Sequence, residues 1–132
     1  MAINYSVHGS SFVDVEQAIL IIEAIGPWNN EFFDSFHQQL GEAIKELKVD
    51  TYGALVKPKG EAVIGQDAFE KHLAFLSQAK TSCIAVNLAL CDTHQITKSI
   101  LDKLYTRAGI VHKFFNNDQD AKAWLNSKLD NS

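Results

Sequence analysis

The chain has 132 residues, of which 46% are hydrophobic and 21% are charged, and its formal net charge is −4. This length suits one domain over residues 1–132, with a core that needs neither disulfides nor metal. Nucleic acids and anionic membrane surfaces both require a basic footprint, which a mildly acidic chain lacks. The totals therefore argue against nucleic acid as a partner and favour an ordinary globular protein.

The two cysteines, Cys83 and Cys91, form neither a Cys-x-x-Cys pair nor a disulfide framework. The first residues lack the basic start and apolar core of a signal peptide. The longest apolar run, residues 18–25, is too short to span a bilayer and contains Glu23. These features predict a cytoplasmic protein with reduced thiols and no integral membrane segment.

The first 47 residues are expected to contain two or three strands and one long helix. Residues 3–15 alternate weakly, which indicates one strand or a hairpin around Gly9. The nearly continuous apolar run 18–26 predicts a strand buried on both faces. Residues 27–47 carry apolar side chains every three or four positions, which predicts an amphipathic helix capped by Asn29 or Asn30.

A second buried strand is expected over residues 51–57, and Pro58 should end it because proline lacks the N–H that a strand ladder needs. The remaining elements are expected to be a helix over 66–80, a strand over 83–91, a helix over 93–108, a strand over 110–115 and a helix over 118–129. Within the strand 83–91, one face should carry Ile84, Val86, Leu88 and Leu90.

Two details of the last helices also follow from the sequence. Gly109 suits the left-handed position that ends the helix over 93–108, and Thr93 or Asp92 suits the cap at the start of that helix. Trp124 lies at helical spacing from Ala121 and Leu125, so we expect it to seal one end of the core.

Strands that alternate with helices through short connections predict an α/β fold. The sheet should be five-stranded and mainly parallel, with four helices and an antiparallel N-terminal strand at one edge. An exposed edge strand permits pairing with another chain, so it leaves a homodimer open.

Three stretches carry a family resemblance: AILIIEAIG before a long helix, CIAVNLA before an amphipathic helix, and KFFNNDQDAKAWL near the end. From Ala18 onward the chain resembles the bacterial SpoIIAA-like proteins of the STAS and Sec14-like group. The resemblance implies a SpoIIAA-like (STAS-like) fold and a role in binding. The related anti-sigma-factor antagonists carry an Asp-Ser-Ser-Gly motif whose Ser is phosphorylated, but the matching residues 57–66 contain no Ser or Thr. The phospho-switch is therefore not expected here.

Ligands of open α/β sheets favour the crevice at the carboxyl ends of the strands. Segments 26–29, 57–65, 91–94 and 115–118 should meet there. The residues that we single out for ligand or partner binding are Trp28, Asn29, Val63, Ile64, Cys91, Asp92, His94 and Trp124. Val63 and Ile64 are apolar residues on a loop, so they either line a pocket or docking patch or pack beneath the next helix against Phe69.

No catalytic motif, cofactor motif or metal-ligand spacing emerges from the sequence. Cys91 could be a thiolate at a helix start with His94 as its base, or it could simply end a strand beside a helix cap. The five histidines show no metal-binding spacing. Glu23 interrupts a buried strand, so it either marks a pocket or faces a side of the sheet near water.

The sequence favours a non-enzymatic binding or regulatory module that recognises a partner protein through the crevice loops and a sheet edge. The alternative, implied by the resemblance to the Sec14-like group, is a carrier or sensor of a small apolar ligand. A Cys91-dependent enzyme is a third hypothesis. The loop 60–65 discriminates between the first two, since a lid over a pocket favours a ligand and a flat exposed patch favours a partner.

Overall fold

The computed structural model describes residues 9–47 and 49–130, so residues 3–8 of the predicted first strand lie outside the described residues. The elements are β1 (Ser10–Glu16), β2 (Ile19–Ile25), α1 (Asn30–Leu47), β3 (Tyr52–Lys59), α2 (Gln66–Gln78), β4 (Thr81–Asn87), α3 (His94–Ala108), β5 (Val111–Phe115) and α4 (Asp118–Asp130). No helix of the described part is long and apolar enough to cross a membrane.

The five strands form one sheet in the order β1-β2-β3-β4-β5. β1 pairs antiparallel with β2, and every other neighbouring pair is parallel. This arrangement confirms the predicted α/β fold, including the antiparallel strand at the N-terminal edge.

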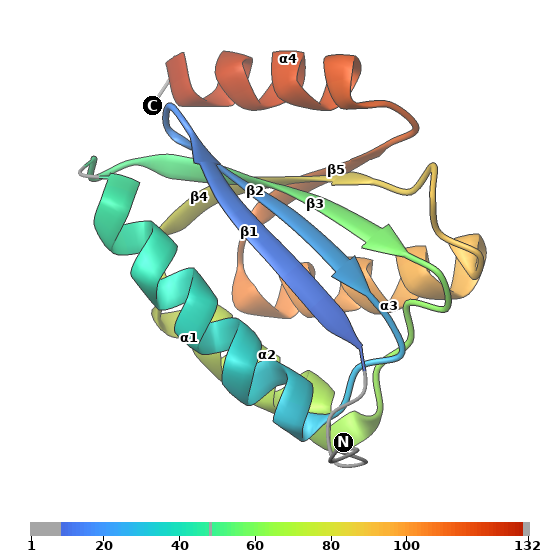
Figure 1. The fold of residues 1–132 in the computed structure, drawn as a ribbon. Helices are drawn as coiled ribbons and strands as arrows, with labels where there is room; N and C mark the ends of the chain where they lie inside the picture. Colours follow the sequence, from blue (N-terminus) through green and yellow to red (C-terminus); the bar gives the residue numbers. More distant parts are fainter. Residues whose placement is uncertain (1–8, 48, 131–132) are drawn as a thin grey trace, which may run out of the picture.

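The helices divide unequally between the two faces of the sheet. Figure 1 shows α1, α2 and α3 on one side of the sheet and α4 alone on the other. Side chains alternate along β2, so Leu20 and Ile22 join the larger core beneath α1–α3, while Ile19 joins a smaller core beneath α4. In that smaller core, Leu125 of α4 is completely buried.

Local signals set three helix ends, and those at Asn29 and Gly109 were predicted. The Phe32 N–H donates to Asn29 Oδ1 at 2.9 Å at the start of α1, and the Asp120 N–H donates to Asn117 Oδ1 at 2.7 Å at the start of α4. Gly109 ends α3 in the left-handed conformation, with a φ of 73°. Thr93 precedes α3, but its hydroxyl makes no capping bond to a backbone N–H.

Two predicted strand ends are wrong. β3 continues through Pro58 to Lys59. Proline is tolerated there because the last β3–β4 pair is at Val56. At Pro58, β4 therefore presents no carbonyl that needs a backbone N–H from β3. β4 ends at Asn87 instead of Cys91, since the Asn87 side chain accepts the Ala89 N–H at 3.0 Å and turns the chain.

Candidate functional site

The loops at the carboxyl ends of the strands are joined by backbone hydrogen bonds. The Trp28 N–H donates to the Val63 carbonyl at 3.1 Å, and the Gly60 N–H donates to the Leu90 carbonyl at 3.2 Å. The Asp92 N–H in turn donates to the Gly60 carbonyl at 2.8 Å. Segments 26–29, 57–65 and 91–94, which were predicted to meet at this end, do meet, and they continue the sheet as paired loops.

Close packing also limits which residue can occupy the end of β2. A Cβ added at Gly26 would lie 2.3 Å from the Glu61 carbonyl oxygen and 2.9 Å from the Ala62 Cα. Only glycine allows this approach of two backbones. The loop 60–65 is therefore held firmly against the end of β2.

A buried hydroxyl anchors the same loop to α3. Thr97 is fully buried, and its hydroxyl donates to the Ala62 carbonyl at 2.8 Å. The Cys91 thiol donates to Thr97 Oγ1 at 3.2 Å, and the Thr93 hydroxyl lies 2.8 Å from the same oxygen. In the described residues no hydrogen bond joins Cys91 to His94, whose side chain is exposed. This geometry makes Cys91 a donor in a structural network.

An apolar cavity of about 50 Å³ lies within the larger core. Aliphatic and aromatic side chains of the sheet and of α1, α2 and α3 line it, and Trp28 and Ile64 contribute from the carboxyl-end loops. The indole N–H of Trp28 is buried and has no hydrogen-bond partner among the described residues. Ile64 and Phe69 also line a neighbouring surface hollow, so Ile64 lies beside both the cavity and the next helix.

Two histidines form a stacked pair at the wall of this cavity. His37 Nε2 lies 2.8 Å from His72 Nδ1, and the rings of Phe33 and Phe75 stack on them at 4.7 and 4.2 Å. Burial lowers the pKa of His72 to about 3, and burial followed by the nearby Lys71 charge lowers the pKa of His37 to about 4. Both rings are therefore neutral at pH 7, and the pair holds α1 against α2.

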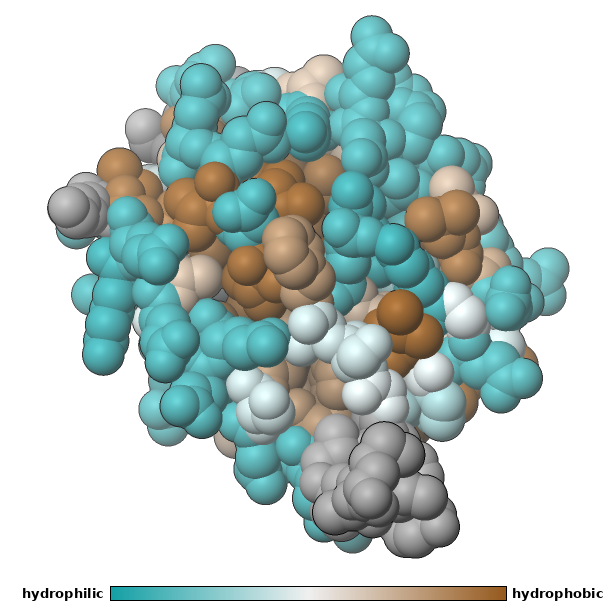
Figure 2. Space-filling model, in the orientation of Figure 1, coloured by the Kyte–Doolittle hydropathy of each residue, from teal (hydrophilic) through white to brown (hydrophobic). Residues whose placement is uncertain are grey.

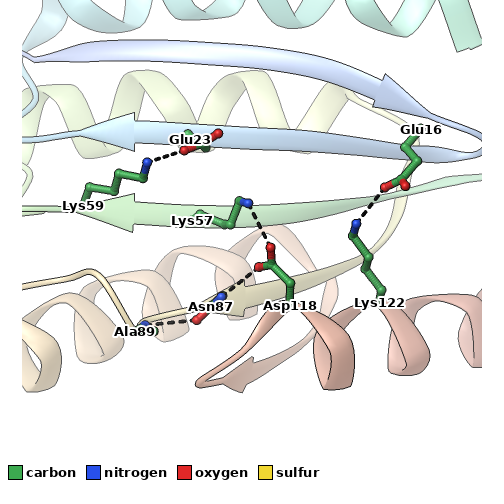
Figure 3. Close-up of polar contacts among 8 residues, drawn as sticks. All are labelled: Glu16, Glu23, Lys57, Lys59, Asn87, Ala89, Asp118 and Lys122. Atoms are coloured by element: carbon green, nitrogen blue, oxygen red, sulfur yellow. Dashed lines mark hydrogen bonds and ion pairs between the residues drawn. The ribbon is translucent and has the colours of Figure 1, made fainter.

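Charged side chains gather on the other face of the sheet, beside the start of α4 (Figure 3). Lys57 Nζ lies 3.0 Å from one oxygen of Asp118, and the Asn87 side chain donates to the other at 2.8 Å. Burial opposes ionisation of Asp118, but these hydrogen bonds lower the pKa of its carboxyl overall. The network ties α4 to β3 and β4 without burying a lone charge.

Glu23 lies on this same face and forms an ion pair with Lys59. The hydrogen bond from Lys59 lowers the pKa of the Glu23 carboxyl. The side chain retains 29% of its exposure. Glu23 therefore faces the thinly covered side of the sheet near water, which was one of its two expected positions.

Exposed apolar side chains border these ion pairs. Phe12 is 57% exposed and Ile25 is 47% exposed. Phe12 pairs with Glu23 across the β1–β2 ladder, and Ile25 follows Glu23 by two residues, so all three side chains share one face. We call the surface formed by Phe12, Glu23, Ile25, Lys57 and Lys59 the open face.

The predicted site residues occupy three different environments. Trp28 and Ile64 line the cavity, and Asn29 and Val63 lie beside them in the hydrogen-bonded loops. Cys91 belongs to the Thr97 network, while Asp92 and His94 are exposed near the start of α3. Trp124 lies apart on α4, where its ring packs 5.9 Å from that of Phe115 in the smaller core.

No family model matches the sequence, and no curated protein does. Solved structures of similar fold include two proteins. One is an uncharacterised protein of the DUF3478 family with a SpoIIAA-like fold from Shewanella loihica, with a TM-score of 0.62, 17% identity, and coverage of 95% of this chain and 98% of that one. The other is an anti-sigma factor antagonist from Mycobacterium paratuberculosis, with a TM-score of 0.54, 11% identity, and coverage of 89% and 94%. The chain therefore has a SpoIIAA-like fold.

Proposed function

We propose that this protein is a non-enzymatic binding module that recognises a partner protein through the open face. The observation that carries the proposal is the exposure of Phe12 and Ile25 beside the Glu23–Lys59 ion pair. Protein interfaces combine an apolar centre with a polar rim, and this surface offers both. The fitting partner presents apolar side chains flanked by charges of both signs. The similarity in fold to an anti-sigma factor antagonist supports a regulatory role of this kind.

Site-specific photo-cross-linking in cells tests this proposal. A benzoylphenylalanine placed at Phe12 keeps an aromatic ring at that position and reports what contacts the open face. The matched control is Ile96 on α3, which is 58% exposed on the other side of the sheet. We expect one adduct of discrete mass from position 12 and none of that mass from position 96. Equal patterns from the two positions would contradict the proposal.

A second candidate function is the binding of a small apolar molecule in the cavity. The observation that favours it is that the loop 60–65 places Ile64 in the cavity wall, as a lid would. Native mass spectrometry of gently purified protein tests it. An added mass that leaves on denaturation and extracts into organic solvent supports a ligand. A bare chain at its calculated mass leaves partner recognition as the function.

A further inference from the structure

The free edge of β1 borders a groove that can hold an additional strand. The groove has a volume of about 240 Å³, and it is lined by residues 11–15 of β1 and by Gln39, Glu42, Ala43 and Glu46 of α1. Figure 2 shows apolar side chains gathered over β1 and between β1 and α1, within a largely hydrophilic surface. Ser11 donates a hydrogen bond to Gln39 at 2.6 Å, which holds α1 beside the strand. We call this feature the β1–α1 groove.

The backbone along this groove carries N–H and C=O groups that point away from β2. The Val15 N–H donates at 2.8 Å to the carboxylate of Asp14, its own neighbour, so it points away from β2. Hydrogen-bonding direction alternates along an antiparallel strand, so the backbone groups of Ser11 and Val13 also point outward. An incoming carbonyl that replaced Asp14 at Val15 would release the Asp14 carboxylate for another contact. An extended segment can therefore join the sheet here by strand addition.

The charges around the groove indicate what that segment must carry. Glu42 and Glu46 line the groove from α1, and Asp14 lies on the opposite side of β1. Within the described residues, none of these three carboxylates forms an ion pair, whereas the nearby Glu16 pairs with Lys122 at 3.0 Å. Side chains of an added strand alternate between the two faces, so Lys or Arg on one face would meet Glu42 and Glu46, while apolar side chains on the other face would lie beside the exposed Phe12.

We infer that the β1–α1 groove accepts an extended basic segment of the partner protein, in which Lys or Arg alternates with apolar residues. This inference rests on the proposed partner recognition and specifies the chemistry of the partner. A second copy of the chain fits poorly, because β1 placed against β1 would bring like charges together. Acidic residues also protect edge strands from aggregation, and the experiment below separates protection from recognition.

The experiment measures binding of a fluorescein-labelled nine-residue peptide of alternating Lys and Val to the full chain, with a Glu/Val peptide as the control. We expect the basic peptide to bind with an affinity that falls as salt rises and the acidic peptide not to bind. The variant Glu42→Lys/Glu46→Lys should weaken binding about tenfold or more. The charge-matched control, Glu61→Lys/Asp130→Lys, lies outside the groove and should change binding less than about twofold.

Hydrogen exchange distinguishes strand addition from general charge attraction. On binding of the basic peptide, the amides of Ser11 and Val13 should become protected. No peptide binding, equal effects of the two double variants, or binding without protection of β1 would overturn the inference. So would a dimer whose β1 amides are protected without peptide. If the basic peptide does not bind the parent protein, this inference fails. If the Phe12 cross-link nevertheless forms, also in Glu42→Lys/Glu46→Lys, the proposed function stands.

Discussion

The two faces of the sheet differ in how completely helices cover them. Three helices enclose one face, with a large apolar core and a neutral histidine pair. One helix covers part of the other face, which retains exposed Phe12 and Ile25 beside ion pairs. Under the proposed function, stability and recognition depend on opposite faces of the sheet. Substitutions on the enclosed face should change the free energy of unfolding, and substitutions on the open face should change binding.

The largest expected effect is a loss of core packing on the enclosed face. Leu104 is completely buried, so Leu104→Ala should lower the free energy of unfolding by about 2–5 kcal/mol through lost burial and a new cavity. On the open face, Ile25→Ala should change it by less than about 0.5 kcal/mol. Urea unfolding at pH 7 measures both. Similar losses in the two variants would contradict the separation of the faces.

The enclosed face should also make the protein sensitive to acid. The pKa of His72 is lowered to about 3 and that of His37 to about 4, both from 6.5. Below pH 6.5 the unfolded chain binds protons that the folded chain does not. The contribution of the two neutral histidines to the free energy of unfolding is therefore complete above pH 6.5 and falls as the pH drops toward 4. Each histidine makes the free energy of unfolding change by at most about 1.4 kcal/mol per pH unit.

The variant His72→Phe tests the source of this slope. It replaces one ring by another of similar shape that does not titrate, so the pH dependence between about 6.5 and 4 should weaken by about half. Urea unfolding at several pH values gives the slope for both proteins. An unchanged slope would mean that other groups cause the loss of stability in acid.

An intermediate effect is expected where α4 meets the sheet. Asp118→Ala removes the acceptor of both Lys57 and Asn87, which should lower the free energy of unfolding by about 1–2 kcal/mol. Asp118→Asn keeps one side-chain acceptor and should lose less. Thermal unfolding of the two variants ranks them. An equal loss would show that the hydrogen bonds contribute little and that the charge of Asp118 matters most.

The smallest expected effect is at Glu23. Its ion pair with Lys59 is partly exposed, and such pairs contribute at most about 1 kcal/mol. Glu23→Gln should therefore leave the free energy of unfolding nearly unchanged in urea at pH 7. A loss of several kcal/mol would show that the carboxylate is effectively buried, and the open face would then be less open than its exposure indicates.

The order of strands and helices could be predicted because each element carries a periodic apolar pattern and a recognisable end, such as Asn29 or Gly109. The ends of β3 at Lys59 and of β4 at Asn87 could not be predicted. Whether a strand passes through Pro58 depends on which neighbouring strand is present at that level. An Asn side chain that turns the chain by accepting a backbone N–H leaves no distinct signal in the sequence.

The candidate sites were less predictable than the fold. Trp28 and Ile64 were singled out as apolar loop residues, and they do meet in the cavity wall. Phe12 and Ile25 were missed because β1 alternates only weakly and the nearly continuous apolar run of β2 does not indicate which face is covered. Their exposure depends on how far α4 reaches across the sheet, which follows from packing. His37 and His72 lie 35 residues apart, so their pairing required knowledge of how α1 lies against α2.

The separation of the two faces is tested most directly by cross-linking from position 12 in the presence of Ile25→Glu, with urea unfolding of the same variant. We expect the discrete adduct to disappear while the free energy of unfolding stays within about 0.5 kcal/mol of the parent protein. An adduct of unchanged yield would contradict the account, because a partner that contacts the open face must meet the new charge at Ile25.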